Sequence, residues 1–253
     1  MHRFFIPPSS VQGNTLTLTG AQAHQVARVL RMRPGERLIV LDDSGFEFEV
    51  RLVAVEPELA RGEVVASQPS TGEPRTRITL YQAVLKGDHF ELVLQKGTEL
   101  GVVEFVPLLT ERTILRDRQD VEKKRPRWEA IIQEAAEQSH RGRLPALRPP
   151  LSFVQACVDV SRTSGVKVIP WEEEAQFRLR DVLRAAQPAA EGLEAALAVS
   201  LFIGPEGGLT RDEISVARGY GLVPVTLGPR ILRAETAGLS AAAAILYELG
   251  DLG

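Results

Sequence analysis

The sequence predicts an α/β fold with a mostly parallel sheet, preceded by a small β-rich module. The main observation is a pair of strand–loop–helix units near the C-terminal end. An apolar run over residues 197–203 breaks into a glycine-rich loop, and a second run over residues 222–227 breaks at Gly228. A helical pattern follows each loop. In such units the strands are parallel, and ligands bind in a crevice outside their carboxyl ends.

A change of pattern near residues 67–75 predicts two domains. This segment is rich in Pro, Ser and Gly and lacks apolar periodicity, which is typical of a domain boundary. We expect one module over residues 1–70 and a second over residues 71–253. A hairpin turn is expected at Asp42–Gly45 of the first module. The strands expected in that module are residues 15–19, 37–41, 46–55 and 62–66, and the helix is residues 21–32.

The C-terminal module alternates strands with helices. The expected strands, besides the two runs above, are residues 78–85, 102–109 and 166–169, and the expected helices are residues 90–100, 126–139, 152–157 and 179–186. This alternation predicts helices on both faces of the sheet. The Ala-rich residues 185–198 are expected to contain a surface loop.

The composition is that of an ordinary soluble globular protein, with 44% hydrophobic and 25% charged residues in a chain of 253. No apolar run approaches the ~20 residues that cross a bilayer, and the N-terminal end lacks the apolar core of a signal peptide. The one cysteine, Cys157, excludes an internal disulfide and a thiolate zinc site, and its apolar neighbours predict a core position. The four histidines are dispersed, so we expect no metal. These features favour a cytoplasmic protein without a membrane partner.

The net charge of −3 does not by itself indicate a nucleic-acid partner, but the charges are unevenly distributed. Residues 1–35 contain four arginines and no acid. Such a segment can bind a phosphate backbone locally. A solvated basic face is an equally good interpretation of the same pattern.

Common catalytic motifs are absent from the sequence. It contains no GxxxxGK(S/T) loop of nucleoside triphosphatases, no GxGxxG dinucleotide fingerprint after a strand and no GxSxG nucleophile elbow. The two loops of the C-terminal units are therefore the candidate site.

The first loop, residues 204–208, reads GPEGG. Glycine lets a ligand approach the backbone closely, and the helix that follows offers free N–H groups. Glu206 would repel a phosphate and would suit a cationic or hydroxyl-bearing ligand. Thr210 and Glu213 are spaced as a capping box. A glycine-rich turn of this kind can also be purely structural.

The second loop, residues 227–237, reads LGPRILRAETA. Ile231 and Leu232 stand between two arginines, and apolar residues in a loop must cover either the core or a flat ligand ring. In the first case they plug the core, and Glu235 and Thr236 cap the last helix. In the second case they line a binding site.

GPEGG and LGPRILRAETA occur at a fixed spacing near the C-terminal end, and further stretches accompany them: HRFF, HQVARVLRMRPGE, QKGTELGV and EAAEQSHR. With this combination the chain resembles the RsmE family of 16S ribosomal RNA uridine-N3 methyltransferases. That family belongs to the SPOUT class of enzymes that depend on S-adenosylmethionine. The resemblance covers essentially the whole chain.

The resemblance implies a PUA-like RNA-binding barrel for residues 1–70 and, for residues 71–253, a SPOUT fold with a deep trefoil knot. The knot comes from the resemblance alone, since threaded chains are almost absent among folds. The resemblance also implies a homodimer and a partner, 16S rRNA in the small ribosomal subunit. S-adenosylmethionine would bind at the knot loops, with Ile231 and Leu232 over its adenine ring. The implied cofactor-binding residues are Pro170, Ile203, Gly204, Pro205, Glu206, Gly207, Leu227, Gly228, Ile231, Leu232, Arg233, Thr236 and Ala237.

Methylation at uridine N3 requires a proton to leave that nitrogen. This points to three catalytic candidates: Arg233 to stabilise charge on the flanking carbonyl oxygens, and Glu235 or Glu206 to accept the proton. Glu235 can equally cap the final helix. The residues expected to contact RNA are Arg3, His24, Arg28, Arg31 and Arg33.

Two other functions stay open at this point. The chain could be a SPOUT methyltransferase that acts on another RNA, such as a transfer RNA. It could also be a non-catalytic RNA-binding protein that keeps the two loops for structure.

Overall fold

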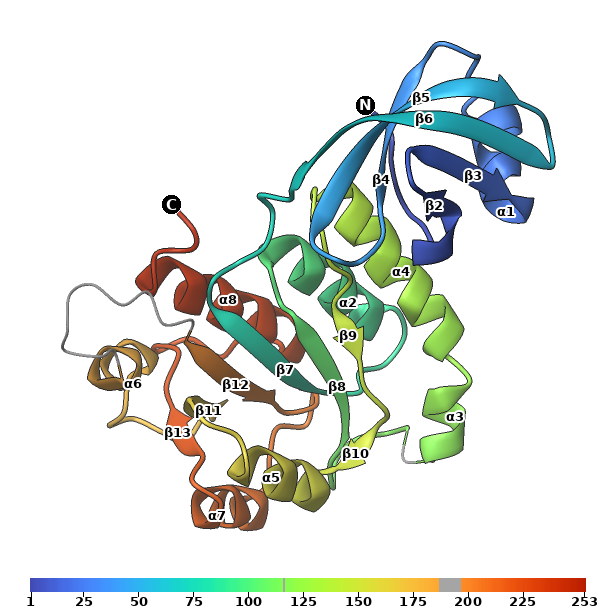
Figure 1. The fold of residues 1–253 in the computed structure, drawn as a ribbon. Coiled ribbons are helices and arrows are strands. Elements are labelled where there is room, and N and C mark those ends of the chain that lie inside the picture. Colours follow the sequence, from blue (N-terminus) through green and yellow to red (C-terminus); the bar gives the residue numbers. More distant parts are fainter. Residues whose placement is uncertain (116, 187–196) are drawn as a thin grey trace. The chain divides into compact units, whose positions relative to one another are not determined.

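The computed structural model describes residues 1–115, 117–186 and 197–253 (Figure 1). It divides into two compact units, one of residues 1–73 and 136–144 and the other of residues 74–135 and 145–253. Most of the Ala-rich segment in which we expect a surface loop lies outside the described residues.

A six-stranded sheet forms the first unit. Its strands are β1 (Arg3–Phe5), β2 (Val11–Gln12), β3 (Thr15–Thr19), β4 (Arg37–Leu41), β5 (Phe46–Val55) and β6 (Leu59–Pro69). The order is β1-β4-β5-β6-β3-β2, with β1 parallel to β4 and the other neighbours antiparallel. The expected hairpin at Asp42–Gly45 joins β4 to β5, and Gly45 has the positive φ, +90°, that this turn uses. Leu38, Val40 and Val50 pack in the core of this unit.

The helix expected over residues 21–32 is shorter and less regular than predicted. A 3-10 turn, η1 (Pro8–Ser10), precedes it along the chain, and α1 (Gly20–His24) passes into a π turn, η2 (Gln25–Val29). Leu30 donates its backbone N–H to the carbonyl of Gln25 at 2.9 Å, the i→i−5 bond of a π turn. The chain leaves the helical path at Arg31, whose φ is +55°.

Residues 136–144 return the chain to the first unit, which sequence patterns do not predict. Arg141 is buried and pairs with Glu73, with 2.9 Å between Nη2 and Oε2. Ala136 packs with Leu41 in a small buried cluster. The unit is therefore completed by a stretch that is remote in sequence.

A parallel sheet forms the second unit. Its strands are β7 (Arg77–Ala83), β8 (Glu104–Leu109), β9 (Ala146–Leu147), β10 (Leu151–Ser152), β11 (Val166–Pro170), β12 (Ala198–Ile203) and β13 (Val223–Val225). The order is β10-β8-β7-β12-β11-β13, and β9 pairs with β8. All of these neighbours are parallel. Strands β7, β12, β11 and β13 therefore end at the same edge.

Helices cover both faces of this sheet, as the sequence predicts. They are α2 (His89–Leu100), α3 (Arg118–Glu122), α4 (Arg125–Gln138), α5 (Phe153–Ser161), α6 (Leu179–Ala186), α7 (Arg211–Gly219) and α8 (Ala234–Glu248). Leu201 packs in one core cluster with residues of α2, α6 and α8, and Phe202 packs in another with residues of α5 and α7. Side chains alternate between faces along a strand, so neighbouring residues of β12 pack against the helices on opposite faces of the sheet. The described helices include none with the length and apolar content to span a membrane.

Two local predictions are confirmed. Helix α7 begins with the expected capping box, because Thr210 accepts the backbone N–H of Glu213 at 3.2 Å and Glu213 accepts that of Thr210 at 2.9 Å. Cys157 lies in the core, where burial raises the pKa of its thiol to about 12. A thiol of this kind is inert at neutral pH.

Candidate active site at the carboxyl edge of the sheet

A cavity of about 1530 Å³ lies at the carboxyl ends of β7, β12, β11 and β13 in the second unit. The segments that follow these four adjacent strands form its walls. The cavity lies where the sequence predicts a ligand crevice. It exceeds the ~300–1,000 Å³ typical of a pocket for one small molecule, so it has room for a cofactor and a second group.

The GPEGG loop after β12 requires glycine at two positions. A Cβ atom on Gly204 would lie 2.8 Å from Cγ of Leu209. Gly208 has a φ of +69°, and a Cβ atom there would lie 2.6 Å from Oε1 of Glu172. Both approaches are shorter than van der Waals contact. Glycine at these two positions thus lets the loop pack closely against Leu209 and Glu172.

Two hydrogen bonds hold the GPEGG loop to neighbouring segments. Oε1 of Glu206 accepts the backbone N–H of Lys86, in the segment after β7, at 2.8 Å. The guanidinium of Arg112, after β8, donates to the carbonyl of Gly207 at 2.7 Å. Glu206 therefore has a structural partner in addition to any role toward a ligand.

The loop after β11 is closed by Glu174. This carboxylate accepts the backbone N–H groups of Gln176 at 2.8 Å and Phe177 at 3.2 Å, and the bond from Gln176 is the main reason that the pKa of Glu174 is lowered. The carbonyl of Phe177 accepts the N–H of Thr226 at 2.8 Å, which joins this loop to the one after β13. The indole Nε1 of Trp171 is buried and has no hydrogen-bond partner in the described part of the chain.

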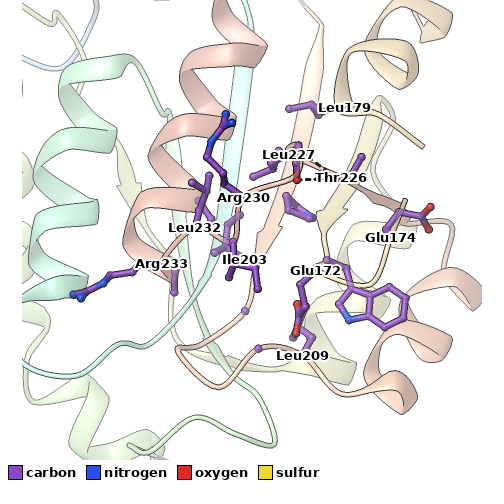
Figure 2. Close-up of a pocket in the computed structure, with 18 of the residues that line it drawn as sticks. Glu172, Glu174, Leu179, Ile203, Leu209, Thr226, Leu227, Arg230, Leu232 and Arg233 are labelled. Atoms are coloured by element: carbon purple, nitrogen blue, oxygen red, sulfur yellow. Dashed lines mark hydrogen bonds between the residues drawn. The ribbon is translucent and has the colours of Figure 1, made fainter. Parts of the chain in front are cut away.

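The loop after β13 does not plug the core. Ile231 is 89% exposed and Leu232 is half-buried. Figure 2 shows Leu232 with Ile203 and Leu227 in the wall of the cavity. Within the described ranges, the backbone N–H groups of Ile231 and Leu232 donate to no protein acceptor. This loop therefore offers a ligand both apolar side chains and main-chain donors.

Charged groups gather at the start of α8. Glu235 lies in its first turn, and its side chain is only 11% exposed. Oε1 of Glu235 is 3.3 Å from Nδ1 of His89, the first residue of α2. Arg233 immediately precedes α8, and Figure 2 shows its side chain directed away from Ile203 and Leu232. A carboxylate and a guanidinium thus stand at the cavity on one short segment.

The structure brings nearly all of the predicted cofactor-binding and catalytic residues to this one cavity. Those that line it are Pro170, Ile203, Gly204, Pro205, Glu206, Gly207, Leu227, Gly228, Ile231, Leu232, Arg233, Glu235 and Ala237. Thr236 is exposed and does not line it. The lining residues lie side by side because the loops that carry them follow parallel strands of one sheet.

Several lining residues were not among the sequence-based candidates. They include Lys86, His89, Trp171, Glu172, Glu174, Thr226 and Arg230. A signal for Lys86 and His89 does exist in the sequence, since they follow an apolar run that forms a strand of the same sheet. Residues after parallel strands share one edge, so the rule that points to the two glycine loops applies to this position as well.

The basic residues of the first unit fall into two groups. The side chain of Arg3 is 8% exposed and forms an ion pair with Glu47. Burial alone would raise the pKa of Glu47, but hydrogen bonds from Gln68 and Arg3 outweigh it and lower the pKa. The RNA contact expected for Arg3 stays a prediction, and in the structure this guanidinium is occupied by the ion pair with Glu47. The other members of the set, His24, Arg28, Arg31 and Arg33, are exposed.

Two protein families match this chain. The RNA methyltransferase domain family matches residues 72–246, and the RNA methyltransferase PUA domain family matches residues 18–65. The first match alone spans more than half of the chain.

Among the described residues, no group of three His, Cys, Asp or Glu side chains is arranged to hold a metal ion.

Relatives of known sequence and structure cover nearly the whole chain. The Ribosomal RNA small subunit methyltransferase E of Synechocystis sp. is 38% identical over 96% of this chain and 77% of its own, and that of Bacillus subtilis is 32% identical over 98% and 97%. The crystal structure of a Ribosomal RNA small subunit methyltransferase E from Neisseria gonorrhoeae bound to S-adenosyl methionine has a TM-score of 0.82, at 32% identity, and covers 98% of this chain and 97% of that one. These findings confirm the predicted SPOUT-type α/β fold with a PUA-like N-terminal domain. The chain belongs to the Ribosomal RNA small subunit methyltransferase E family of RNA methyltransferases.

Proposed function

We propose that this protein transfers the methyl group of S-adenosylmethionine to N3 of a uridine in the 16S rRNA of the small ribosomal subunit. The observation that carries the proposal is the large cavity at the carboxyl edge of the parallel sheet, lined by both glycine loops. Family membership supports the reaction class, and the Neisseria gonorrhoeae relative binds this cofactor. The choice of uridine N3 rests on the sequence resemblance to the RsmE family.

The cavity fits the chemistry of S-adenosylmethionine. The backbone N–H groups of Ile231 and Leu232 have no protein acceptor within the described ranges and can donate to a ligand, and the GPEGG loop forms part of the cavity wall. Leu232 and Leu227 suit a flat ring, and Glu172 suits a positively charged group. When bound, the cofactor supplies an electrophilic methyl group, and the electron pair of the broken carbon–sulfur bond stays on sulfur.

The residues of the chain would then manage the proton on N3. We assign its removal to Glu235, with the electron pair of the N–H bond left on N3 to form the new bond to carbon. The Glu235 carboxylate is poorly solvated and lines the cavity, whereas Glu206 is exposed and accepts a backbone hydrogen bond from Lys86. Arg233 would stabilise negative charge on the carbonyl oxygens of the base. Glu206 remains the alternative base.

The proposal includes a homodimer in the cytoplasm, with an RNA-binding module over residues 1–70 and a knotted methyltransferase domain over residues 71–253. Ile231 and Tyr247 support the dimer, since both are strongly exposed apolar side chains at the cavity that a second copy would cover. The knot and the location are supported by the resemblance to the SPOUT class. Light scattering on the purified protein measures the mass of the assembly.

Methyl transfer to ribosomal RNA is the direct test. Small subunits from a strain that lacks the gene are incubated with the protein and with S-adenosylmethionine that carries an isotopically labelled methyl group. We expect label in 16S rRNA, recovered by mass spectrometry as 3-methyluridine. Label on transfer RNA or on another base would overturn the target. No label, together with no heat on titration of the cofactor in a calorimeter, would indicate a non-catalytic RNA-binding protein.

The exposed arginines of the first unit predict salt-dependent RNA binding. An Arg28→Ala/Arg31→Ala protein is expected to bind 16S rRNA more weakly. The logarithm of the binding constant falls linearly with the logarithm of the salt concentration. The steepness of this line should decrease by about 0.7 for each phosphate of single-stranded RNA that the variant no longer neutralises. Arg37→Ala/Arg51→Ala is the matched control, since these exposed arginines are already paired with Glu49 and Glu63. Fluorescence anisotropy across a salt series measures both slopes. Equal slopes for the two double variants would contradict the assignment.

A further inference from the structure

A short turn between β7 and α2 contacts both carboxylates that are candidates for the base. The backbone N–H of Lys86 donates to Glu206 at 2.8 Å, and Nδ1 of His89 lies 3.3 Å from Oε1 of Glu235. Lys86 and His89 both line the cavity, and their backbones are joined by a hydrogen bond of 3.3 Å. Neither residue belongs to the two glycine loops. The turn is thus a separate element that orders the acidic groups of the site.

We propose that His89 is the positioning residue for Glu235, holding its carboxylate toward the cavity for removal of the uridine N3 proton. The inference rests on the proposed function. Among the described residues, His89 is the one side chain that pairs with Glu235. The imidazole comes from the start of α2 and the carboxylate from the first turn of α8, so the pair joins the two helices beside the cavity.

Positioning matters here because a glutamate side chain is flexible. A free carboxylate samples several rotamers, and fixing such a side chain costs up to ~2 kcal/mol of conformational entropy. A partner that fixes it in advance lets the proton transfer begin from the productive geometry. The other charged side chains that line the cavity are Lys86, Glu172, Glu174, Arg178, Arg180, Glu206, Arg230, Arg233 and Glu248. None of them forms an ion pair with Glu235 within the described residues, so the orientation of this carboxylate depends on His89.

Kinetics of variants at His89 test the inference. His89→Leu is expected to lower kcat about tenfold, a part of the ~10²–10⁴-fold that a positioned base contributes. KM for the rRNA and the affinity for S-adenosylmethionine should stay unchanged. His89→Lys, which places another nitrogen donor beside the carboxylate, should restore most of the loss. Gln95→Ala, at an exposed position of the same helix that does not line the cavity, is the control for helix stability.

A double-mutant cycle shows whether His89 acts through Glu235. In a Glu235→Gln background, His89→Leu should cause no further loss of kcat. A tenfold loss of kcat in both backgrounds would overturn the inference. Full activity of His89→Leu, measured where the wild-type protein is active, would overturn it as well. If the wild type transfers no methyl group to any RNA, the proposed function falls and this role falls with it.

Nuclear magnetic resonance of the ligand-free protein gives a readout that does not depend on activity. The chain has four histidines, and the other three, His2, His24 and His140, belong to the other unit. Glu235→Gln should shift the Nδ1 resonance of His89 and leave the other three in place. An unchanged His89 resonance would show that the pair does not form and would also overturn the inference.

Discussion

Glu235→Gln is expected to lower kcat for methyl transfer by about 100-fold or more, because a positioned base contributes roughly 10²–10⁴-fold. The amide has almost the shape of the carboxylate but cannot accept a proton. Since the proposed role is confined to proton removal, the affinity for S-adenosylmethionine and the KM for rRNA should change little. Single-turnover kinetics measure the chemical step, and calorimetry measures cofactor binding.

Glu206→Gln is the matched comparison. Its amide oxygen can still accept the N–H of Lys86, so the GPEGG loop should keep its position. The exchange of a charged for a neutral acceptor weakens this hydrogen bond by on the order of 1 kcal/mol. We therefore expect kcat to fall by less than tenfold. The reverse result, a large loss at Glu206 and a small one at Glu235, would move the base to Glu206. If Glu235 only caps α8, its substitution would instead lower stability by about 0.3–1 kcal/mol and spare kcat.

Phe202→Ala is expected to lower the free energy of unfolding of the second unit by about 3–5 kcal/mol. Phe202 is fully buried in β12, and its ring stacks on Tyr81 with 4.2 Å between centroids. Phe153 meets the same ring edge-on at 6.3 Å. Truncation would therefore leave a cavity and remove two aromatic contacts. It would also loosen the strand that carries Ile203 into the cofactor cavity.

Urea unfolding followed by tryptophan fluorescence measures this loss. Both tryptophans of the chain, Trp128 and Trp171, belong to the second unit, so the signal reports on that unit. Phe177→Ala is the control, because this phenylalanine is 53% exposed and exposed substitutions usually change stability by less than ~0.5 kcal/mol. Equal midpoints for the two variants would contradict the assigned packing.

Apolar periodicity was sufficient to predict the longer elements. The strands at residues 37–41 and 46–55 and the helix at residues 179–186 have the bounds that the sequence predicts. Strands β1, β2, β9 and β10 were missed, since two or three residues cannot show a period. The helix over residues 21–32 was overextended, because the π turn and the positive φ of Arg31 leave no trace in the apolar pattern.

The site was predictable where the sequence marks a strand end with glycine, as in the two loops around Gly204 and Gly228. Contacts that depend on strand order were not predictable. The approach of His89 to Glu235 requires α2, which follows β7, to pack against α8, which follows β13, although the two helices are remote in sequence. The same limit explains why the ion pair of Arg3 was not predicted. Its partner Glu47 is brought to it by the pairing of β1 with β4 and of β4 with β5.

The first unit is assembled from two separated stretches, and this has a consequence for folding during synthesis. When residue 73 leaves the ribosome, Glu73 still lacks Arg141, and Leu41 lacks Ala136. These partners arrive only after about 70 more residues, which takes roughly 4–14 seconds at 5–20 residues per second. The nascent N-terminal unit therefore remains incompletely packed until the ribosome has translated about the first third of the catalytic unit.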